Sequence, residues 1–180
     1  MECRFGEISL IGLPGSGKST VGRQLARRLQ VPFTDSDHVI EQRIGCSIRE
    51  FFEREGEARF RDVEEAVLDE LTLQPHGVLA TGGGATLRPA NRLHLQERCQ
   101  VVYLRSTPEE VFRRVRNDVN RPLLQVNDPL TRLRDLFAVR DPLYRETAHF
   151  VIETGRPSVA SLVNMIVMQL ELGTPRPPTE

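Results

Sequence analysis

The sequence predicts an α/β domain built on a parallel sheet. Over its 180 residues, short apolar runs with strand character alternate with segments of helical periodicity, which is the pattern that a parallel sheet with crossover helices produces. The first apolar run leads into a glycine-rich turn, and a helical segment follows that turn. A chain of this length is expected to form one domain and to bury a core of its own without disulfides or metals.

Five strands are expected, at residues 8–13, 31–34, 78–81, 101–104 and 149–153. The clearest helix starts carry a capping side chain followed by proline or by an acid three residues on. Pro142 is expected to end the helix that begins after Asp128, which leaves Arg140 at a helix end. The expected helices start near Thr20, at Ser47 (ending at Gly56), before Phe60, at Thr107, at Asp128 and at Pro157.

Composition and charge exclude several classes of function. The formal net charge is -1, so the chain has no overall basic field for nucleic acid or an anionic membrane. Its three cysteines are far apart and form no CxxC pair, which indicates reduced thiols. No signal-peptide core opens the chain, and no apolar run approaches the ~20 residues of a membrane span. We therefore expect a cytoplasmic protein with no nucleic-acid or membrane partner.

Residues 12–19, Gly-Leu-Pro-Gly-Ser-Gly-Lys-Ser, match the motif G-x-x-x-x-G-K-[ST] between a predicted strand and a predicted helix. In this context the backbone N–H groups of the loop bind phosphate oxygens, the lysine adds a positive charge, and the serine hydroxyl ligates Mg²⁺. Lys18 is the only lysine among the 24 basic residues. The motif predicts nucleotide binding, although GTPases, ATPases and kinases share it.

Two further segments follow predicted strands at the edge where ligands of open α/β sheets bind. Asp35-Ser36-Asp37 comes after the second strand, and we expect one carboxylate to face Mg²⁺ and the other to face an acceptor. The alternative is a helix N-cap, a position that aspartate favours. Gly82-Gly83-Gly84 comes after the third strand, and it allows either a close backbone approach to a ligand or simply a tight turn.

Three arginines are candidates for binding anionic groups. Arg61 lies three residues before Glu64 on a predicted helix, so the acid can hold the planar guanidinium toward a carboxylate, unless the two form an ordinary surface pair. Arg140 suits either a second anion contact or a favourable charge at a helix C-terminus. Arg121 lies in the polar segment 117–128, which is either a loop that closes over the nucleotide or a solvated connector.

Taken in order, these segments resemble the shikimate kinase family over nearly the whole chain apart from the tail. The phosphate loop is general, but its combination with the other motifs is specific. These motifs are Asp35-Ser-Asp37, Gly56-Glu57 with Phe60-Arg61 and Glu64, the glycine triplet, Arg121-Pro-Leu-Leu124, and Arg140 with Pro142-Leu-Tyr144.

The resemblance implies a three-layer, nucleoside-monophosphate-kinase-like P-loop fold with a five-stranded parallel sheet flanked by helices. It also implies ATP-dependent phosphorylation of the shikimate 3-hydroxyl, which gives shikimate 3-phosphate and ADP on the way to chorismate and the aromatic amino acids. Residues 1–172 would form the kinase domain, with a substrate-binding segment at about 37–64, a lid at about 117–128 and a disordered tail at 173–180. The protein would be a monomer.

The resemblance assigns roles residue by residue. Lys18, Asp37 and Arg121 would be catalytic, and Ser19 would bind Mg²⁺ with Asp35 acting through water. Shikimate would be bound by Asp37, Arg61, Gly82, Gly83, Gly84 and Arg140, with Glu64 orienting Arg61. ATP would be bound by Gly15, Ser16, Gly17, Lys18, Ser19, Thr20 and Arg121, with Arg114 and Arg156 beside the adenine.

Two other functions remain open at this point. A related small-molecule kinase, such as a gluconate kinase, would share the loop and the fold and differ in the arginine clamp. A ligand-sensing module would belong to a different class of protein. It would be favoured by a degraded phosphate loop or by the loss of Asp37, and the sequence shows neither.

Overall fold

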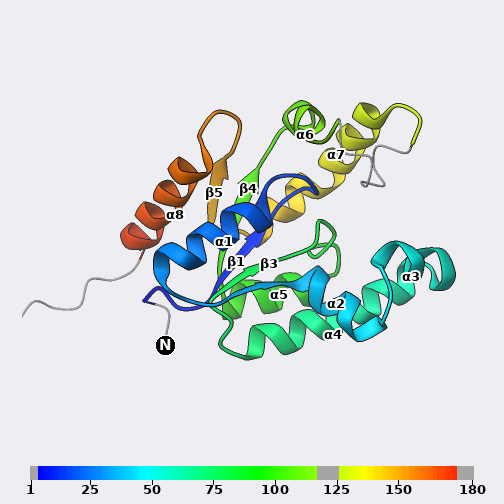
Figure 1. Cartoon of the computed structure of the whole chain (residues 1–180), viewed down its shortest axis with the longest axis horizontal. Coiled ribbons are helices and arrows are strands. Elements are labelled where there is room, and N and C mark those ends of the chain that lie inside the picture. The colour runs from blue at the N-terminus through cyan, green and yellow to red at the C-terminus, as the bar shows by residue number, and fades with distance from the viewer. Residues whose placement is uncertain (1–3, 117–125, 174–180) are drawn as a thin grey trace, which may run out of the picture.

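The computed structural model of the chain describes residues 4–116 and 126–173. Its centre is a five-stranded sheet with the order β2-β3-β1-β4-β5, in which every neighbouring pair is parallel (Figure 1). The predicted parallel sheet is therefore confirmed, and each strand end lies within two residues of its predicted position. The strands are β1 (Ile8–Ile11), β2 (Phe33–Asp35), β3 (Val78–Ala80), β4 (Gln100–Arg105) and β5 (Phe150–Glu153).

Helices cover both faces of the sheet and complete three layers. The helices are α1 (Lys18–Leu29), α2 (Ser36–Ile44), α3 (Ile48–Glu55), α4 (Glu57–Leu73), α5 (Pro89–Arg98), α6 (Pro108–Val115), α7 (Pro129–Thr147) and α8 (Val159–Gly173). On one face α1 and α8 pack against the sheet in a core that includes Leu10 and Leu25. On the other face α5, α6 and α7 share a core with β4 that includes Leu95 and Tyr103.

The elements of the expected substrate-binding segment form a lobe beside the sheet. Helices α2, α3 and α4 share their own apolar cluster, which includes Ile40, Phe51 and Phe60. In Figure 1 this lobe lies at the end of the molecule away from α8. The Ser47 hydroxyl caps α3 by accepting from the backbone N–H of Glu50 at 3.1 Å, as the sequence predicts.

One expectation about helices is wrong, and one helix was not predicted. Pro142 does not end a helix, because α7 continues through it to Thr147. Asp141 and Tyr144, on either side of the proline, are both anchored by hydrogen bonds to other elements, so tertiary contacts outweigh the missing backbone donor. Helix α5 has no counterpart in the prediction, although Pro89 at its start is a typical first-turn residue.

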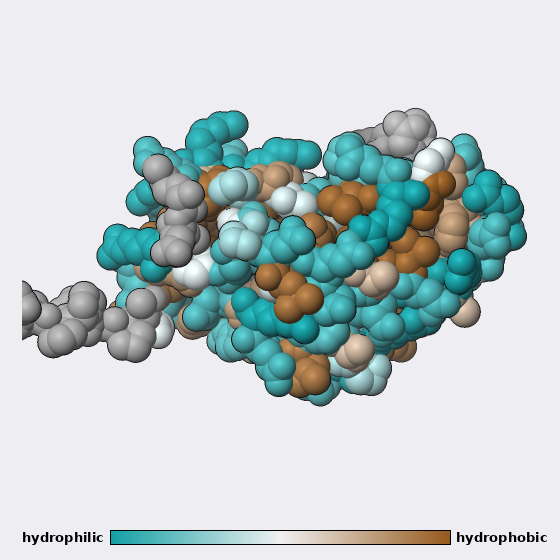
Figure 2. Space-filling model, turned by 90° about the horizontal axis from the view of Figure 1, so that it is seen from below, coloured by the Kyte–Doolittle hydropathy of each residue, from teal (hydrophilic) through white to brown (hydrophobic). Residues whose placement is uncertain are grey.

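The surface carries scattered apolar side chains. Leu73 and Leu93 are among the exposed ones, and on the face shown in Figure 2 hydrophilic residues separate the apolar patches. Within the described ranges, no helix is both long enough and apolar enough to span a bilayer.

Candidate active site

The phosphate loop lies between the end of β1 and the first residue of α1. Lys18 is 8% exposed, and its Nζ donates to the carbonyl oxygens of Gly12 and Leu13, each at 2.8 Å. The hydroxyl of Ser16 is buried and has no hydrogen-bond partner among the described residues. A helix N-terminus, an ammonium group and an unpartnered hydroxyl therefore meet in one loop, which suits a phosphate group.

Asp35 joins this loop to the second strand. Its Oδ2 accepts a hydrogen bond from the Ser19 hydroxyl at 2.7 Å. Its Oδ1 accepts from the backbone N–H of Asp37 at 3.0 Å and thereby caps α2. The N-cap interpretation is thus correct for Asp35, and the same carboxylate also lies against the hydroxyl expected to bind a metal ion.

Asp37 lies in the first turn of α2. Its pKa is raised to about 6, first by burial and then by the negative charges of Asp35 and Glu64, while the charge of Lys18 opposes them. These are the expected effects of desolvation and of neighbouring like charges on a carboxylic acid. A carboxylate with this pKa is a better proton acceptor near neutral pH than an ordinary aspartate.

The loop of Gly82, Gly83 and Gly84 approaches the site residues so closely that side chains would not fit. A β-carbon on Gly82 would lie 2.7 Å from Oδ1 of Asp37, and one on Gly84 would overlap both terminal nitrogens of Arg61. The backbone N–H of Gly82 donates to the buried Ser36 hydroxyl at 3.3 Å. The glycines thus let the loop after β3 lie close to the side chains of Asp37 on α2 and Arg61 on α4.

Arg61 and Glu64 form a buried ion pair on α4. Arg61 Nη1 lies 2.7 Å from Glu64 Oε1, and their side chains are 12% and 1% exposed, which rules out the ordinary surface pair. Burial raises the pKa of Glu64, and the charge and hydrogen bond of Arg61 oppose that rise. The guanidinium carbon also lies 5.1 Å from the ring centroid of Phe60, so the arginine is held from several sides.

Two adjoining cavities gather these residues. The first, of about 270 Å³, is lined by the phosphate loop together with Asp35 and Asp37. The second, of about 170 Å³, is lined by Arg61, Glu64 and Arg140 from two helices distant in the sequence. The two cavities share a wall, which consists of Pro14, Asp37, Gly82 and Gly83.

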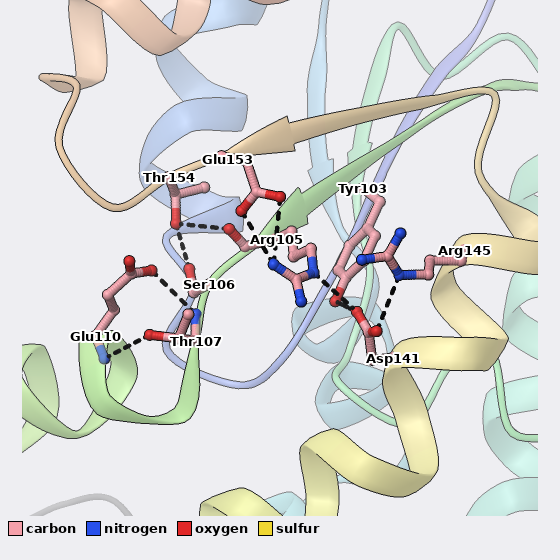
Figure 3. Close-up of polar contacts among 9 residues, drawn as sticks. All are labelled: Tyr103, Arg105, Ser106, Thr107, Glu110, Asp141, Arg145, Glu153 and Thr154. Atoms are coloured by element: carbon pink, nitrogen blue, oxygen red, sulfur yellow. Dashed lines mark hydrogen bonds and ion pairs between the residues drawn. The ribbon is translucent and has the colours of Figure 1, made fainter.

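The two residues predicted to lie beside the adenine, Arg114 and Arg156, have different surroundings. Arg114 on α6 donates to the Ser16 carbonyl at 3.2 Å and to the Thr154 carbonyl at 2.8 Å, so it braces the phosphate loop against the β5 end. Thr154 is hydrogen-bonded to Ser106 across the ends of β4 and β5 (Figure 3). Arg156 is exposed. Arg121 and residues 117–125 of the expected lid lie outside the described residues.

Some lining residues are absent from the sequence-based prediction. Pro14 and Ile48 both line the second cavity. Pro14 occupies a variable position of the loop motif, and Ile48 begins a helix with an ordinary apolar pattern, so neither carries a recognisable signal. Tyr144, whose hydroxyl donates to the Gly83 carbonyl, was part of the family resemblance without a role.

This fold and site define a P-loop kinase of small molecules. The phosphate loop adjoins the hydrogen-bonded oxygens of Ser19 and Asp35, and the neighbouring cavity is lined by Arg61 and Arg140. The chain belongs to the shikimate kinase family, whose model matches residues 14–171. The family resemblance seen in the motifs is confirmed, and with it the assignment as a kinase that uses a nucleotide.

Individual proteins that are similar to this chain include members of the same family. A shikimate kinase from Paracidovorax citrulli is 66% identical over 175 residues, which cover 96% of each chain. The structure of a shikimate kinase from Acinetobacter baumannii, solved in complex with shikimate, matches with a TM-score of 0.91 and 46% identity over 97% of each chain. A gluconokinase from Sinorhizobium meliloti matches with a TM-score of 0.55 at 16% identity, covering 96% of this chain and 94% of its own, and this likeness shows the fold alone.

Proposed function

We propose that this site transfers the γ-phosphoryl group of ATP to the 3-hydroxyl of shikimate. The observation that carries the proposal is the shared wall between the two cavities. A nucleotide on the phosphate loop and a carboxylic acid held by Arg61 and Arg140 would meet at Asp37 and the glycine triplet. The family membership of the chain and the shikimate bound to its A. baumannii relative support the same acceptor.

The phosphate loop provides hydrogen-bond donors and positive charge that suit phosphate groups. We assign the β- and γ-phosphates to Lys18 and to the loop residues Gly15, Ser16, Gly17, Ser19 and Thr20, because backbone donors and a helix N-terminus converge there. Arg114 and Arg156 remain the proposed neighbours of the adenine. In this role Arg114 would brace the loop at the same time, since its donors already reach Ser16 and Thr154.

The residues near Ser19 fit a magnesium ion. A hydroxyl and a carboxylate oxygen are hard oxygen ligands, and Mg²⁺ in nucleotide sites is held by few protein groups plus phosphates and water. Among the described residues no cluster of three or more His, Cys, Asp or Glu side chains is placed to hold a metal. Ser19 would ligate the ion, Asp35 would hold one of its waters, and the bound ion would neutralise charge on the phosphates.

The acceptor side would recognise a carboxylate by charge and shape. Arg61 presents a planar fork that can form paired hydrogen bonds with a carboxylate, and Glu64 fixes that fork from behind. Arg140 would bind the same group from the other side of the cavity. Gly82, Gly83 and Gly84 would contact the ring of the acceptor through their backbone, because no side chain intervenes.

The transfer step follows from this placement. Asp37 would orient the acceptor hydroxyl, whose oxygen forms a bond to the γ-phosphorus while the bond from that phosphorus to the β–γ bridging oxygen breaks. The hydroxyl proton passes to the Asp37 carboxylate, and ADP leaves. Lys18 and the proposed lid residue Arg121 would stabilise the charge of the loose transition state, since phosphoryl transfer depends mainly on positioning and electrostatics.

A coupled assay of ADP release tests the proposal. Purified protein with ATP and Mg²⁺ is compared without acceptor and with shikimate, quinate or gluconate. We expect ADP release that depends on shikimate. Release with gluconate instead would keep the fold and the loop chemistry but overturn the assignment of the arginine clamp. Tight ATP binding without release on any acceptor would favour a sensing module.

Two further properties are part of the proposal. We expect a monomer, which light scattering after size-exclusion chromatography would check. We also expect a cytoplasmic location, in keeping with a metabolic kinase that uses ATP.

A further inference from the structure

One arginine outside the two cavities ties the loop after β3 to α4. Arg88 is the N-cap residue of α5, and its side chain reaches across to α4. Its Nη1 donates to Oδ1 of Asp62 at 2.7 Å, and its Nη2 donates to the carbonyl oxygen of Ala58 at 3.2 Å. Because Ala58 and Asp62 are four residues apart on the helix, Arg88 holds one turn of α4 with both terminal nitrogens of its guanidinium.

The turn of α4 that Arg88 holds also carries Arg61. The guanidinium of Arg61 contacts Glu64 at 2.7 Å. It also lies so close to Gly84 that a β-carbon there would come within 2.4 Å of both terminal nitrogens. The separation between α4 and the loop after β3 therefore determines the space that is available to the Arg61 guanidinium.

The backbone between Gly84 and Arg88 is a compact pair of turns. The N–H of Ala85 donates to the Gly82 carbonyl at 3.1 Å, and the N–H of Leu87 donates to the Gly84 carbonyl at 3.1 Å. Arg88 follows Leu87 directly in the sequence. A contact that fixes Arg88 on α4 thus constrains Gly84 as well, since short backbone hydrogen bonds connect the two positions.

We propose that Arg88 is a positioning residue for acceptor binding, whose two hydrogen bonds to α4 keep the Arg61 guanidinium and the loop after β3 at the separation that a bound carboxylate requires. The inference rests on the proposed function, because it concerns the arginine assigned to the acceptor carboxylate. Arg88 is not among the described residues that line the two cavities. It would therefore act through Arg61 and not by touching the acceptor.

Two alternatives make different predictions. In the first, Arg88 and Asp62 form an ordinary, partly exposed ion pair of the kind that contributes little, and the apolar cluster of Ala85 with Leu68 of α4 holds the loop without it. In the second, the positive charge of Arg88 attracts the anionic acceptor through space. Only the positioning role requires the hydrogen bonds between Arg88 and α4 for acceptor affinity.

The first test is Arg88→Ala, with Arg98→Ala as the matched control. Arg98 on α5 forms a corresponding pair nearer the other end of α4, where its Nη1 donates to Oδ1 of Asp69 at 2.7 Å and to the Asp69 carbonyl at 3.2 Å. The side chains of Arg88 and Asp62 are 29% and 54% exposed, and those of Arg98 and Asp69 are 25% and 45% exposed. The two pairs are therefore alike, except that only the first adjoins Arg61.

For Arg88→Ala we expect the KM for shikimate to rise about 3- to 10-fold, with kcat and the KM for ATP changed by less than about twofold. Arg98→Ala should lower the melting temperature at least as much, because Arg98 also donates to Thr72. It should leave the KM for shikimate unchanged.

Asp62→Ala separates positioning from attraction through space. The substitution removes one anchor of Arg88 and, at the same time, a negative charge. The positioning role predicts a higher KM for shikimate, as in Arg88→Ala but smaller, because the contact with the Ala58 carbonyl remains. Attraction through space predicts an unchanged or lower KM, since the surroundings of the acceptor become more positive. An unchanged or lower KM would thus overturn the inference.

A double-mutant cycle with Arg61→Lys completes the test. If Arg88 acts through Arg61, Arg88→Ala adds no further rise in the KM for shikimate once the Arg61 guanidinium is absent. Additive effects, equal changes for both substrates, or the same rise in Arg98→Ala would each overturn the inference. A wild-type protein that releases no ADP with shikimate would instead overturn the proposed function, so the two failures are distinguishable.

Discussion

At the scale of single residues, the proposed transfer depends most on Asp37. Among the residues that the structure describes, it is the one ionisable side chain that lines both cavities. Replacing Asp37 with Asn keeps the size of the side chain and removes its capacity to accept a proton. We expect turnover to fall by a factor of about 10² or more, while ATP binding measured by calorimetry stays close to that of the wild type. Near-normal turnover would remove Asp37 from the mechanism.

The raised pKa of Asp37 predicts a pH dependence. The carboxylate must be ionised to accept the hydroxyl proton, and its pKa in the free protein is about 6. We therefore expect kcat/KM for shikimate to fall as the pH drops through about 6, and to be nearly constant between pH 7 and 8. A profile that stays flat down to pH 5 would show that no group with this pKa takes part.

Arg61 is the residue on which acceptor affinity should depend. Truncation to alanine would leave Glu64 as an unpaired buried charge, so Arg61→Lys is the better variant because it keeps the charge and loses the fork. Loss of a charge-assisted hydrogen bond costs about 1.5–3 kcal/mol, which is roughly a 10- to 150-fold rise in the KM for shikimate. The KM for ATP should stay within about threefold. A matching rise in both KM values would argue against a carboxylate clamp.

At the scale of elements, the loop after β3 determines how closely the two cavities meet. A methyl group on Gly84 would overlap the Arg61 guanidinium, whereas one on Gly83 would strike the Pro14 ring of the phosphate loop. Gly84→Ala should therefore raise the KM for shikimate by at least about tenfold with ATP affinity preserved. Gly83→Ala should weaken the binding of both shikimate and ATP. Steady-state kinetics of the two variants checks this difference. The same changes in the KM values for shikimate and ATP in both variants would contradict it.

The elements also show which parts of the site the sequence can predict. Asp35 and Asp37 were predictable because they follow a strand at the edge where ligands bind. The Arg61–Glu64 spacing can be read from the sequence, but the sequence does not show that the glycine loop, which is distant along the chain, lies against both side chains. The continuation of α7 through Pro142 likewise depends on Asp141 and Tyr144 meeting β4 and Gly83, and local propensity contains no information about such contacts.

At the scale of the whole molecule, the site should lower the stability of the fold. Asp37 binds its proton more tightly in the folded chain, with a pKa of about 6, than in the unfolded chain, with a pKa of 3.8. The unfolded state therefore binds fewer protons in this range, and the free energy of unfolding falls as the pH rises from about 4 through about 6. Above that range the ionised carboxylate destabilises the fold.

Thermal unfolding of Asp37→Asn tests this loss of stability. The variant should melt at a higher temperature than the wild type at pH 8, and the difference should shrink toward pH 4, where the wild-type carboxyl is protonated in the folded state. Asp135→Asn on the exposed side of α7 is the control, for which we expect no such trend. An equal melting temperature of Asp37→Asn and wild type at pH 8 would mean that the buried charge is better solvated than its surroundings indicate.

The identity of the product tests the proposed reaction most sharply. Protein, ATP, Mg²⁺ and shikimate are incubated together, and the mixture is analysed by ³¹P–¹H correlation NMR. We expect a single new phosphate ester, coupled to the proton on the carbon that bears the 3-hydroxyl and formed in the same amount as ADP. A phosphate on another hydroxyl, or ADP and inorganic phosphate with unchanged shikimate, would contradict it.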